Sequence, residues 1–330
     1  MKEPSISVPY LRPRRLRDNA ILREAIAETA VRPEHLMLPM FVSDIKTDNP
    51  IASMPGVSQR SIPSLVREIG SLVERGLRSF ILFGVPKTKD ALASAAYAED
   101  AIVARAIEAI RRDIGDAAFV ATDVCLCSYT DTGHCGVIED GRVANDPSLE
   151  LLAKTALRHA RAGANMVAPS DMMDGRVRAI REELDDHGFE HLPIMSYAIK
   201  YASSLYGPFR DAADSTPQFG DRRGYQMDFR NRGEAIREAM LDAEEGADLL
   251  MVKPGLAYLD ILSDLRELTE LPLAAYQVSG EYAMIRFAAL AGAIDEAKVT
   301  RELWTAFRRA GANIILTYHA ADAVRNGWLG

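Results

Sequence analysis

Short apolar runs alternate with amphipathic stretches along most of the 330-residue chain. Eight of these runs are almost continuously apolar, which is typical of parallel strands that are buried on both faces. They comprise residues 36–42, 80–85, 119–126 and 165–170, followed by runs that begin at positions 193, 248, 272 and 313. Because each run is followed by a stretch with helical periodicity, the pattern predicts repeated βα units.

The predicted helices lie between the strands, at residues 63–75, 91–112, 148–162, 173–187, 232–245, 258–269 and 299–310. At four helix-to-strand junctions a glycine stands where a left-handed cap would end the helix. Eight βα units predict an α/β fold, an eightfold (β/α) TIM barrel. An open doubly wound sheet has the same alternation. We favour the barrel because no GxGxxG turn follows the first strand and because distinctive residues end several different strands.

Two segments do not fit this alternation. Residues 1–35 precede the first strand and are rich in arginine and proline, so we expect an N-terminal arm used for oligomerisation, ahead of a catalytic barrel at residues 36–330. Residues 207–229 form an unusually long connection rich in Gly, Pro, Asp and Arg. Because long loops in compact domains often cover active sites, we predict that residues 207–229 are a lid.

The net charge of -8 argues against a nucleic-acid-binding surface and favours small molecules or other copies of the chain as partners. No apolar stretch is long enough for a membrane span, and the first residues lack the apolar core of a signal peptide. A cytoplasmic location is therefore expected. In a reducing compartment, three clustered cysteines indicate a metal site or a reactive site rather than a disulfide framework.

The three cysteines are the strongest chemical signal. Cys125 and Cys127 end the third predicted strand, where both would point to one side, and a turn at Gly133 can return Cys135 toward them. Three thiolates suit a soft or borderline metal and leave a fourth coordination position open, which is typical of catalytic zinc. His134 could supply the fourth ligand, or it could be a solvated loop residue. The alternative to a metal site is that the three cysteines are simply buried and bind no metal.

Two lysines also end predicted strands. Lys253 follows an apolar run and precedes Pro-Gly, which would place its amine at the mouth of the barrel. Lys200 has a similar place after the fifth strand, although such a residue alone is more often an ordinary helix-surface lysine. Two ammonium groups that face one cavity disfavour each other's charge, so the pair indicates an amine activated for imine formation.

Other polar residues follow strand ends at the same expected face: Asp123, Ser170, Asp171, Ser279 and Tyr318. Asp123 is a candidate for proton transfer, and Ser279 and Tyr318 could hold a carboxylate, although each could instead satisfy loop backbone. Arg210 and Arg222 in the predicted lid suit an anion, because guanidinium pairs with carboxylate in a bidentate fork. The residues predict a covered site for a small carbonyl acid.

The chain resembles porphobilinogen synthases of the cysteine-rich, zinc-using type along nearly its whole length. The resemblance rests on RPRRLR, LPMFV, MPGVSQRS, ILFGVP, DVCLCSYTDTGHCG, APSDMMDGRV, SYAIKYASSLYGPFRDA, GDRRGYQMD, DLLMVKPG and AYQVSGEYAMI. It implies a TIM barrel with an N-terminal arm, usually assembled as an octamer, that condenses two 5-aminolevulinate molecules to porphobilinogen with loss of two waters in heme biosynthesis.

The resemblance also implies residue roles. Lys253 would form the imine with the substrate that gives the propionate side of the product, and Lys200 would bind the substrate that gives the acetate side. Arg210 and Arg222 would hold one substrate carboxylate, and Ser279 and Tyr318 the other. Zn2+ would be bound by Cys125, Cys127 and Cys135 and act as a Lewis acid.

Two further features follow from the same family. In many bacterial relatives a glutamate at the position of Glu238 belongs to an allosteric Mg2+ site. Many zinc-type relatives have Ser-His before Gly-His-Cys, where this chain has Asp131 and Thr132, so no accessory metal contact is expected from this turn.

Two other functions compete with this interpretation. A Schiff-base aldolase on the same barrel would need one lysine and a carboxylate, but it leaves the cysteines and the second lysine unexplained. In a non-enzymatic scaffold with structural zinc, Lys200 and Lys253 need not share a cavity.

Overall fold

The computed structural model describes residues 12–329. The chain divides into two compact units, of which the first ends at Ala30 and the second begins at Val31. The first unit contains the 3-10 turn η1 (Pro13–Leu16) and helix α1 (Ala20–Ala25). The Asn19 side chain begins α1 by accepting a hydrogen bond from the Leu22 amide at 3.1 Å. Residues 1–11 of the predicted arm lie outside the described residues.

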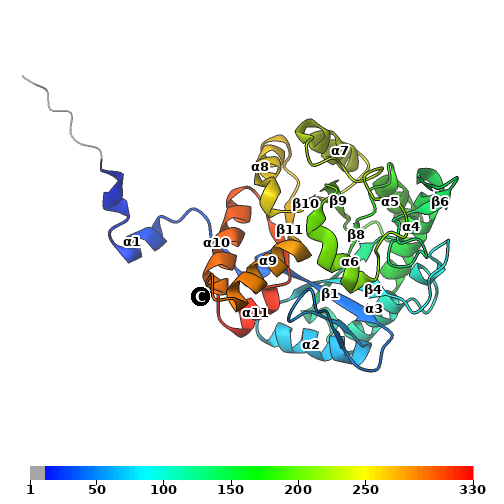
Figure 1. The fold of residues 1–330 in the computed structure, drawn as a ribbon, viewed down its shortest axis with the longest axis horizontal. Helices are drawn as coiled ribbons and strands as arrows, with labels where there is room; N and C mark the ends of the chain where they lie inside the picture. The colour runs from blue at the N-terminus through cyan, green and yellow to red at the C-terminus, as the bar shows by residue number, and fades with distance from the viewer. Residues whose placement is uncertain (1–11, 330) are drawn as a thin grey trace, which may run out of the picture. The chain divides into compact units, whose positions relative to one another are not determined.

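The second unit is built on eight parallel strands in the order β8-β5-β4-β1-β12-β11-β10-β9 (Figure 1). A parallel bridge between Val167 and Ile194 joins β8 to the chain entering β9 and closes the ring. The strands are β1 (Leu36–Ser43), β4 (Ser79–Val85), β5 (Phe119–Val124), β8 (Met166–Pro169), β9 (Met195–Lys200), β10 (Leu249–Lys253), β11 (Leu273–Gln277) and β12 (Ile314–Thr317). The predicted TIM barrel is therefore confirmed.

Helices surround the ring of strands (Figure 1). They are α2 (Ile62–Glu74), α3 (Ile102–Asp113), α4 (Asn145–Arg161), α5 (Arg176–Asp186), α6 (Gly207–Ala213), α7 (Arg232–Glu244), α8 (Leu259–Leu268), α9 (Ser279–Leu290), α10 (Glu296–Arg309) and α11 (Ala320–Arg325). All four predicted capping glycines have positive φ, from 93° at Gly76 to 117° at Gly311. They end helices as expected.

One predicted helix begins late. Residues 91–101 are not part of α3, which starts only at Ile102. Asp90 accepts hydrogen bonds from the amides of Leu92 and Ser94, and Ala93 adopts a left-handed conformation at φ 54°. These local bonds hold the segment in turns and a short 3-10 helix, η3 (Ser94–Ala96), instead of an α-helix, because aspartate side chains compete with helical hydrogen bonding.

Several elements were not predicted. Besides α6 and α11, these include the hairpin of β6 (Val137–Glu139) and β7 (Arg142–Ala144), and the pair β2 (Asn49–Pro50) and β3 (Ser58–Arg60). Helix α9 was not predicted because its apolar residues do not lie on one buried face. Phe287 and Leu290 are exposed, whereas Glu281 is buried.

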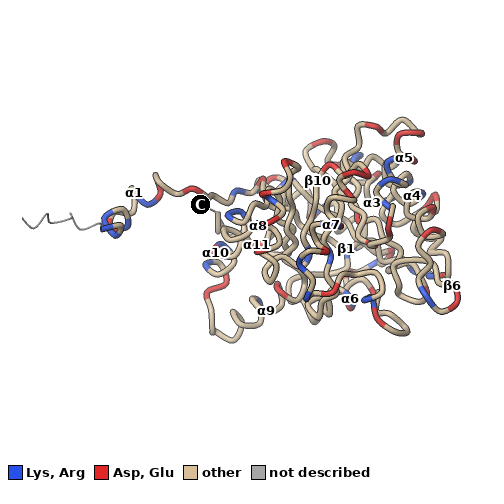
Figure 2. Tube along the Cα trace, turned by 90° about the horizontal axis from the view of Figure 1, so that it is seen from above, with Lys and Arg blue, Asp and Glu red and all other residues tan. Residues whose placement is uncertain are grey.

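Acidic and basic residues are interspersed over the barrel unit in the view of Figure 2. Within residues 12–329, no helix combines the length and the apolar character needed to cross a bilayer.

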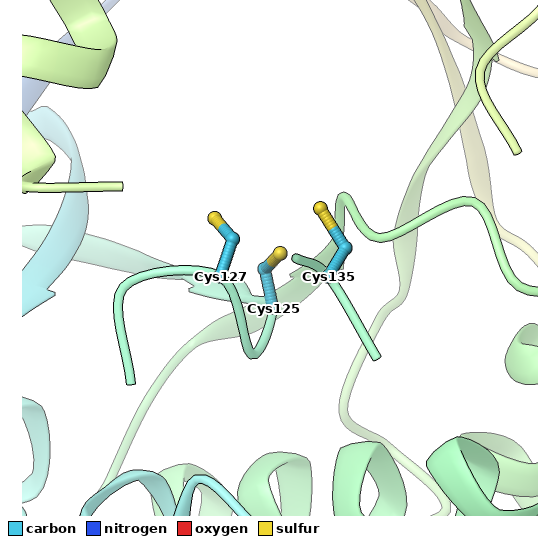
Figure 3. A group of neighbouring side chains, drawn as sticks. All are labelled: Cys125, Cys127 and Cys135. Atoms are coloured by element: carbon cyan, nitrogen blue, oxygen red, sulfur yellow. The ribbon is translucent and has the colours of Figure 1, made fainter. Parts of the chain in front are cut away.

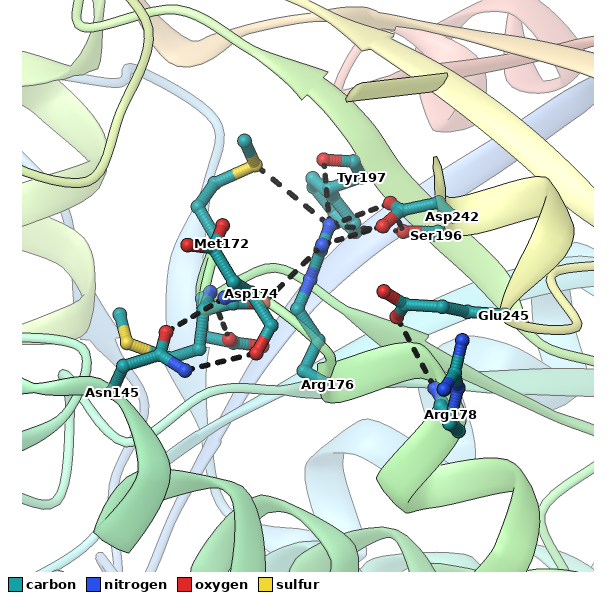
Figure 4. Close-up of polar contacts among 11 residues, drawn as sticks. Asn145, Met172, Asp174, Arg176, Arg178, Ser196, Tyr197, Asp242 and Glu245 are labelled. Carbon is teal, nitrogen blue, oxygen red and sulfur yellow. Dashed lines mark hydrogen bonds and ion pairs between the residues drawn. The ribbon is translucent and has the colours of Figure 1, made fainter. Parts of the chain in front are cut away.

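A buried ion pair fixes two outer helices against the barrel (Figure 4). Arg176, the first residue of α5, donates two hydrogen bonds to Asp242 of α7, at 2.6 and 2.7 Å. Both side chains are at most 3% exposed, and Ser196 of β9 donates a further bond to Asp242. Because β9 ends at Lys200, this pair anchors the strand that carries that lysine.

We predict that Asp242→Asn lowers the free energy of unfolding by about 3–5 kcal/mol, because it leaves the Arg176 guanidinium buried without a counter-charge. Urea unfolding followed by circular dichroism measures the loss. The matched control is Asp264→Asn, which breaks the pair with Arg232, whose side chain is 64% exposed, and is expected to cost less than about 1 kcal/mol. Equal costs for the two variants would contradict the prediction.

Candidate active site

Lys200 and Lys253 lie side by side at the carboxyl end of the barrel strands. They are the last residues of β9 and β10, and these parallel strands pair them directly in register. Both are almost completely buried, at 4% and 5% exposure. Lys200 is therefore not a helix-surface lysine, and the structure brings the two amines into one enclosed space.

Aromatic rings surround the Lys253 amine. Its Nζ lies 4.4 Å from the ring centre of Tyr276, 4.9 Å from Tyr197, 5.1 Å from Phe209 and 5.3 Å from Tyr206. Burial, followed by the charge of the neighbouring lysine, lowers the pKa of Lys253 from 10.5 to about 7. Near neutral pH a substantial fraction of this amine is thus unprotonated and nucleophilic.

Asp123, near the end of β5, faces the same space. Burial raises the pKa of Asp123 to about 7, and the charges of Cys127, Lys253 and Lys200 act on it. Its Oδ1 is buried and has no hydrogen-bond partner. A carboxyl group with this pKa can both give and take a proton near neutrality, which is the property required of a general acid-base group.

Lys200 is held by the strand end next to it. Its Nζ donates a hydrogen bond to the main-chain carbonyl of Ser170. Asp171 follows, and burial raises its pKa to about 6, while its Oδ2 has no partner. The residues predicted at the ends of β5, β8, β9 and β10 therefore line one site.

The three cysteine side chains converge with their sulfur atoms toward the same side (Figure 3). The Sγ atoms of Cys125, Cys127 and Cys135 all lie within 4.8 Å of one another, and the residues are at most 5% exposed. None forms a disulfide. Three convergent thiols at this spacing fit a thiophilic divalent metal, and among residues 12–329 this is the one group of three such ligand side chains.

The reason given for this convergence needs correction. Strand β5 ends at Val124, so Cys125 and Cys127 lie in the following bend and turn rather than on an extended strand. The Leu126 carbonyl accepts hydrogen bonds from the amides of Tyr129 and Thr130, which closes this turn. The turn, and not strand alternation, directs the first two thiols toward the third.

The predicted lid rests on the loop that carries Cys135. Arg222 donates a hydrogen bond to the Gly133 carbonyl at 2.9 Å, and the Gln218 amide donates to the Thr132 carbonyl at the same distance. Gly133 has φ 70°, and a Cβ there would collide with the Thr216 carbonyl of the lid. A glycine is therefore needed both for this turn and for the close approach.

His134 joins the same two segments and is neither a free ligand nor solvated, since it is 3% exposed. Its Nε2 donates to the Phe219 carbonyl at 3.0 Å, and its Nδ1 accepts from the Tyr225 hydroxyl at 3.1 Å. That hydroxyl also accepts a bond from the Cys135 amide at 3.4 Å. With both nitrogens engaged, His134 connects the lid to the cysteine loop.

The two lid arginines lie near each other. Burial, followed by the charge of Arg222, lowers the pKa of Arg210, and the Arg210 Nε has no hydrogen-bond partner. Gln226, only 2% exposed, likewise has both amide atoms unpartnered. The Gln226 side chain lines the cavity that also contains Glu238 and Asp174. The two adjacent guanidinium groups suit a carboxylate ligand.

Ser279 and Tyr318 lie on another wall of the site. Ser279 begins α9, and its Oγ accepts a bond from the Phe209 amide at 3.0 Å and donates to the Leu205 carbonyl at 3.3 Å. The Tyr318 hydroxyl lies 3.0 Å from that of Tyr276, which also borders Lys253. Tyr318 is therefore near the amine, whereas the Ser279 hydroxyl is already engaged.

Glu238 lies apart from the lysines. It lines a cavity of about 780 Å³ together with Asp174, Glu234, His134 and residues of the predicted lid. Burial, followed by the charge of Asp174, raises the pKa of Glu238. Neither lysine and none of the three cysteines is among the residues that line this cavity.

Comparisons with known proteins agree over nearly the full length. A family model described as delta-aminolevulinic acid dehydratase matches residues 10–326. The chain is 53% identical over 326 residues to a delta-aminolevulinic acid dehydratase of Synechocystis sp., covering 97% of this chain and 99% of the relative. For the enzyme of that name from Bacillus subtilis the identity is 50%, covering 98% and 99%.

A solved structure is similar as well. It is the delta-aminolevulinic acid dehydratase (porphobilinogen synthase) of Toxoplasma gondii in complex with the reaction product porphobilinogen. The identity is 47% and the TM-score 0.94, over 96% of this chain and 91% of that chain.

We predict that Cys127→Ala weakens binding of Co2+ at least about tenfold, because a site that provides three thiolates would keep only two. Titration followed by thiolate-to-cobalt charge-transfer absorption measures this loss. Far-UV circular dichroism of the metal-free proteins serves as the control for folding. Binding of equal affinity and spectrum in the variant would contradict the assignment of Cys127 as a ligand.

Proposed function

Because the chain belongs to the delta-aminolevulinic acid dehydratase family, and is therefore a hydro-lyase that makes porphobilinogen for tetrapyrrole biosynthesis, we propose that Lys253 and Lys200 bind the two substrate molecules. The observation that carries this assignment is the direct pairing of the two buried lysines on β9 and β10. Lys253 forms the imine with the propionate-side substrate, and Lys200 binds the acetate-side substrate.

Imine formation follows from the state of Lys253. The neutral amine attacks the ketone carbon of 5-aminolevulinate, and the resulting carbinolamine loses water to give the imine. The water leaves with a proton that Asp123 can supply, since its pKa of about 7 leaves part of the population protonated. The aromatic rings around Lys253 exclude bulk water, and this burial, together with the charge of Lys200, lowers the pKa of the amine.

The substrate carboxylates have separate binding groups. Arg210 and Arg222 bind one carboxylate. Tyr318 and Ser279 bind the other, on the wall next to Lys253. For Ser279 this requires that its hydroxyl exchange the Leu205 carbonyl for the ligand. Two separate groups of carboxylate-binding side chains suit two substrate molecules.

Zinc is the metal that we assign to Cys125, Cys127 and Cys135, because thiolates favour it over Mg2+. When bound, it supplies Lewis-acid polarisation of a carbonyl or water oxygen. The three buried thiols would hold it. Hydrogen bonds from the other two cysteines, followed by the charges of Arg222 and Lys200, lower the pKa of Cys127, whereas hydrogen bonds from Cys127 and Cys135 raise the pKa of Cys125. The thiolate form is thereby favoured at Cys127.

Regulation and assembly complete the proposal. Glu238, in its cavity with Asp174 and Glu234, is the proposed ligand of an allosteric Mg2+. Residues 1–35 form the arm that assembles copies of the chain, with an octamer as the expected state, and residues 207–229 form the lid. Three unpaired cysteines suit the cytoplasm. The aldolase and scaffold alternatives leave the joint placement of two lysines and three thiols unexplained.

We expect the initial rate of imine formation at Lys253 to rise with pH through a midpoint near 7, as its amine loses a proton, and to fall again at higher pH, as Asp123 loses the proton that it gives to the leaving water. The folded-state pKa of Lys253 is lowered to about 7, so the neutral amine is scarce below this pH and predominant above it. Borohydride trapping with 5-aminolevulinate, read by peptide mass spectrometry, measures the profile.

Lys253→Met is the negative control for that trapping. Lys154 is the internal control within the same protein. Its hydrogen bond to Glu150 raises its pKa, so it stays protonated near neutral pH and should not be trapped. A midpoint close to the ordinary lysine value of 10.5 would refute the activated-amine assignment.

Removal of metal by a chelator should abolish porphobilinogen formation, and added Zn2+ should restore it, because the cysteine site provides the only thiolate ligand group among residues 12–329. Product formation measured before chelation, after it and after return of Zn2+ or Mg2+ separates the two metals. Full activity of the chelated, metal-free protein would remove zinc from the mechanism.

A further inference from the structure

Glu281 is a buried carboxylate with no role in the mechanism above. It is 1% exposed and lies in the first turn of α9, two residues after Ser279. Its Oε2 accepts a hydrogen bond from the Val278 amide and its Oε1 accepts one from the Leu256 amide, both at 2.7 Å. One side chain therefore joins the loops that follow two neighbouring barrel strands, β10 and β11.

Only half of this arrangement is ordinary helix capping. A glutamate at the third helical position commonly accepts a bond from the amide just before the helix, as Glu281 does from Val278. Capping leaves the other oxygen to solvent. Here it binds the amide of Leu256, three residues after Lys253 and far away in sequence. The second bond is thus not explained by the helix.

The loop that Glu281 holds has little room to move. A Cβ on Gly255 would lie 2.7 Å from the Phe307 ring and 3.0 Å from the Tyr276 carbonyl, so the backbone between Lys253 and Leu256 is packed closely. Glu281 supplies the hydrogen bond that fixes the far end of this loop. Any shift of the loop moves the end of β10 and therefore the lysine.

The start of α9 is packed equally closely against the segment that follows Lys200. A Cβ on Gly280 would lie 2.6 Å from the Leu205 carbonyl, and Ser279 exchanges hydrogen bonds with Leu205 and Phe209. Phe209 in turn borders the Lys253 amine. Glu281 therefore stands where the loops after β9, β10 and β11 meet.

We propose that Glu281 is a positioning residue that fixes the Lys253 amine relative to the carboxylate-binding wall of Ser279 and Tyr318. The inference rests on the proposed roles of Lys253, Ser279 and Tyr318. A carboxylate suits this task because each of its oxygens accepts one main-chain N–H, whereas an amide would direct its own NH2 at one of them. Burial raises the pKa of Glu281 to about 7, and the hydrogen bonds from the Leu256 and Val278 amides oppose this rise because they favour the charged form.

Two variants separate positioning from capping. Glu281→Gln removes one acceptor at constant size. Glu281→Asp is one methylene shorter, so it retains a carboxylate that can cap Val278 but cannot also reach Leu256. The control is Asp248→Asn, which alters an exposed carboxylate that accepts a main-chain bond from Ile194 at 2.8 Å, at the opposite end of β10.

The experiment is borohydride trapping of 5-aminolevulinate at Lys253 and Lys200 in the full chain, with kcat, KM and the urea midpoint measured for each variant. Glu281→Gln and Glu281→Asp are expected to slow trapping at Lys253 about 10- to 100-fold and to raise KM, since small displacements of a reacting group have effects of this size. Trapping at Lys200 should fall much less. Asp248→Asn should resemble the wild type.

Each other outcome is decisive. Glu281→Asp with wild-type trapping at Lys253 would reduce Glu281 to a helix cap and overturn the inference. Trapping that falls equally at Lys253 and Lys200, together with a lower urea midpoint, would also overturn the inference, because it would indicate a general loss of stability. Wild-type protein that traps nothing at Lys253 would instead overturn the proposed role of this lysine. If Glu281→Gln does not fold, Glu281→Asp still decides the question.

Discussion

The site depends on one register between two parallel strands. Because β9 and β10 pair Lys200 with Lys253 at their carboxyl ends, two amines enter one enclosed space in which neither is solvated. Two like charges that lie close together in a medium of low polarity have a high free energy, so one amine loses its proton near neutral pH. A shift of one residue in this register would turn one lysine away from the barrel interior. The surrounding structure keeps that register fixed.

Buried polar and charged side chains oppose folding unless they are paired, and the barrel contains two kinds of them. Arg176 and Asp242 are buried as a pair with matched hydrogen bonds, so they anchor β9 without leaving a free charge. The site itself is different: Asp123 and Asp171 keep unpartnered oxygens in a buried environment. Such unpaired groups oppose folding and are retained where a ligand will complete their hydrogen bonds. The paired side chains therefore stabilise the fold, whereas the unpartnered carboxylate oxygens of Asp123 and Asp171 are available to a ligand.

The sequence predicted the barrel, because near-continuous apolar runs and capping glycines are local signals that repeat with each βα unit. It also predicted that the two lysines would share a site and that the three cysteines would converge, and the structure brings each group together. It missed α9, which depends on a contact between distant segments, because α9 buries Glu281 against the loop after β10. It also gave the wrong reason for the convergence of Cys125 and Cys127, which follows from a local turn that the apolar run did not reveal.

The lid and the cysteine loop behave as one assembly for a related reason. Thr132 and Gly133 offer their carbonyls to the lid, and His134 uses both ring nitrogens to bind it, while Cys135 follows directly in the same loop. Arg222 of the predicted lid acts on the thiols as well, because its positive charge favours the thiolate form of Cys127. Residues 207–229 and the cysteine loop are therefore linked through shared contacts, so that a change in either one would act on the other to the same extent.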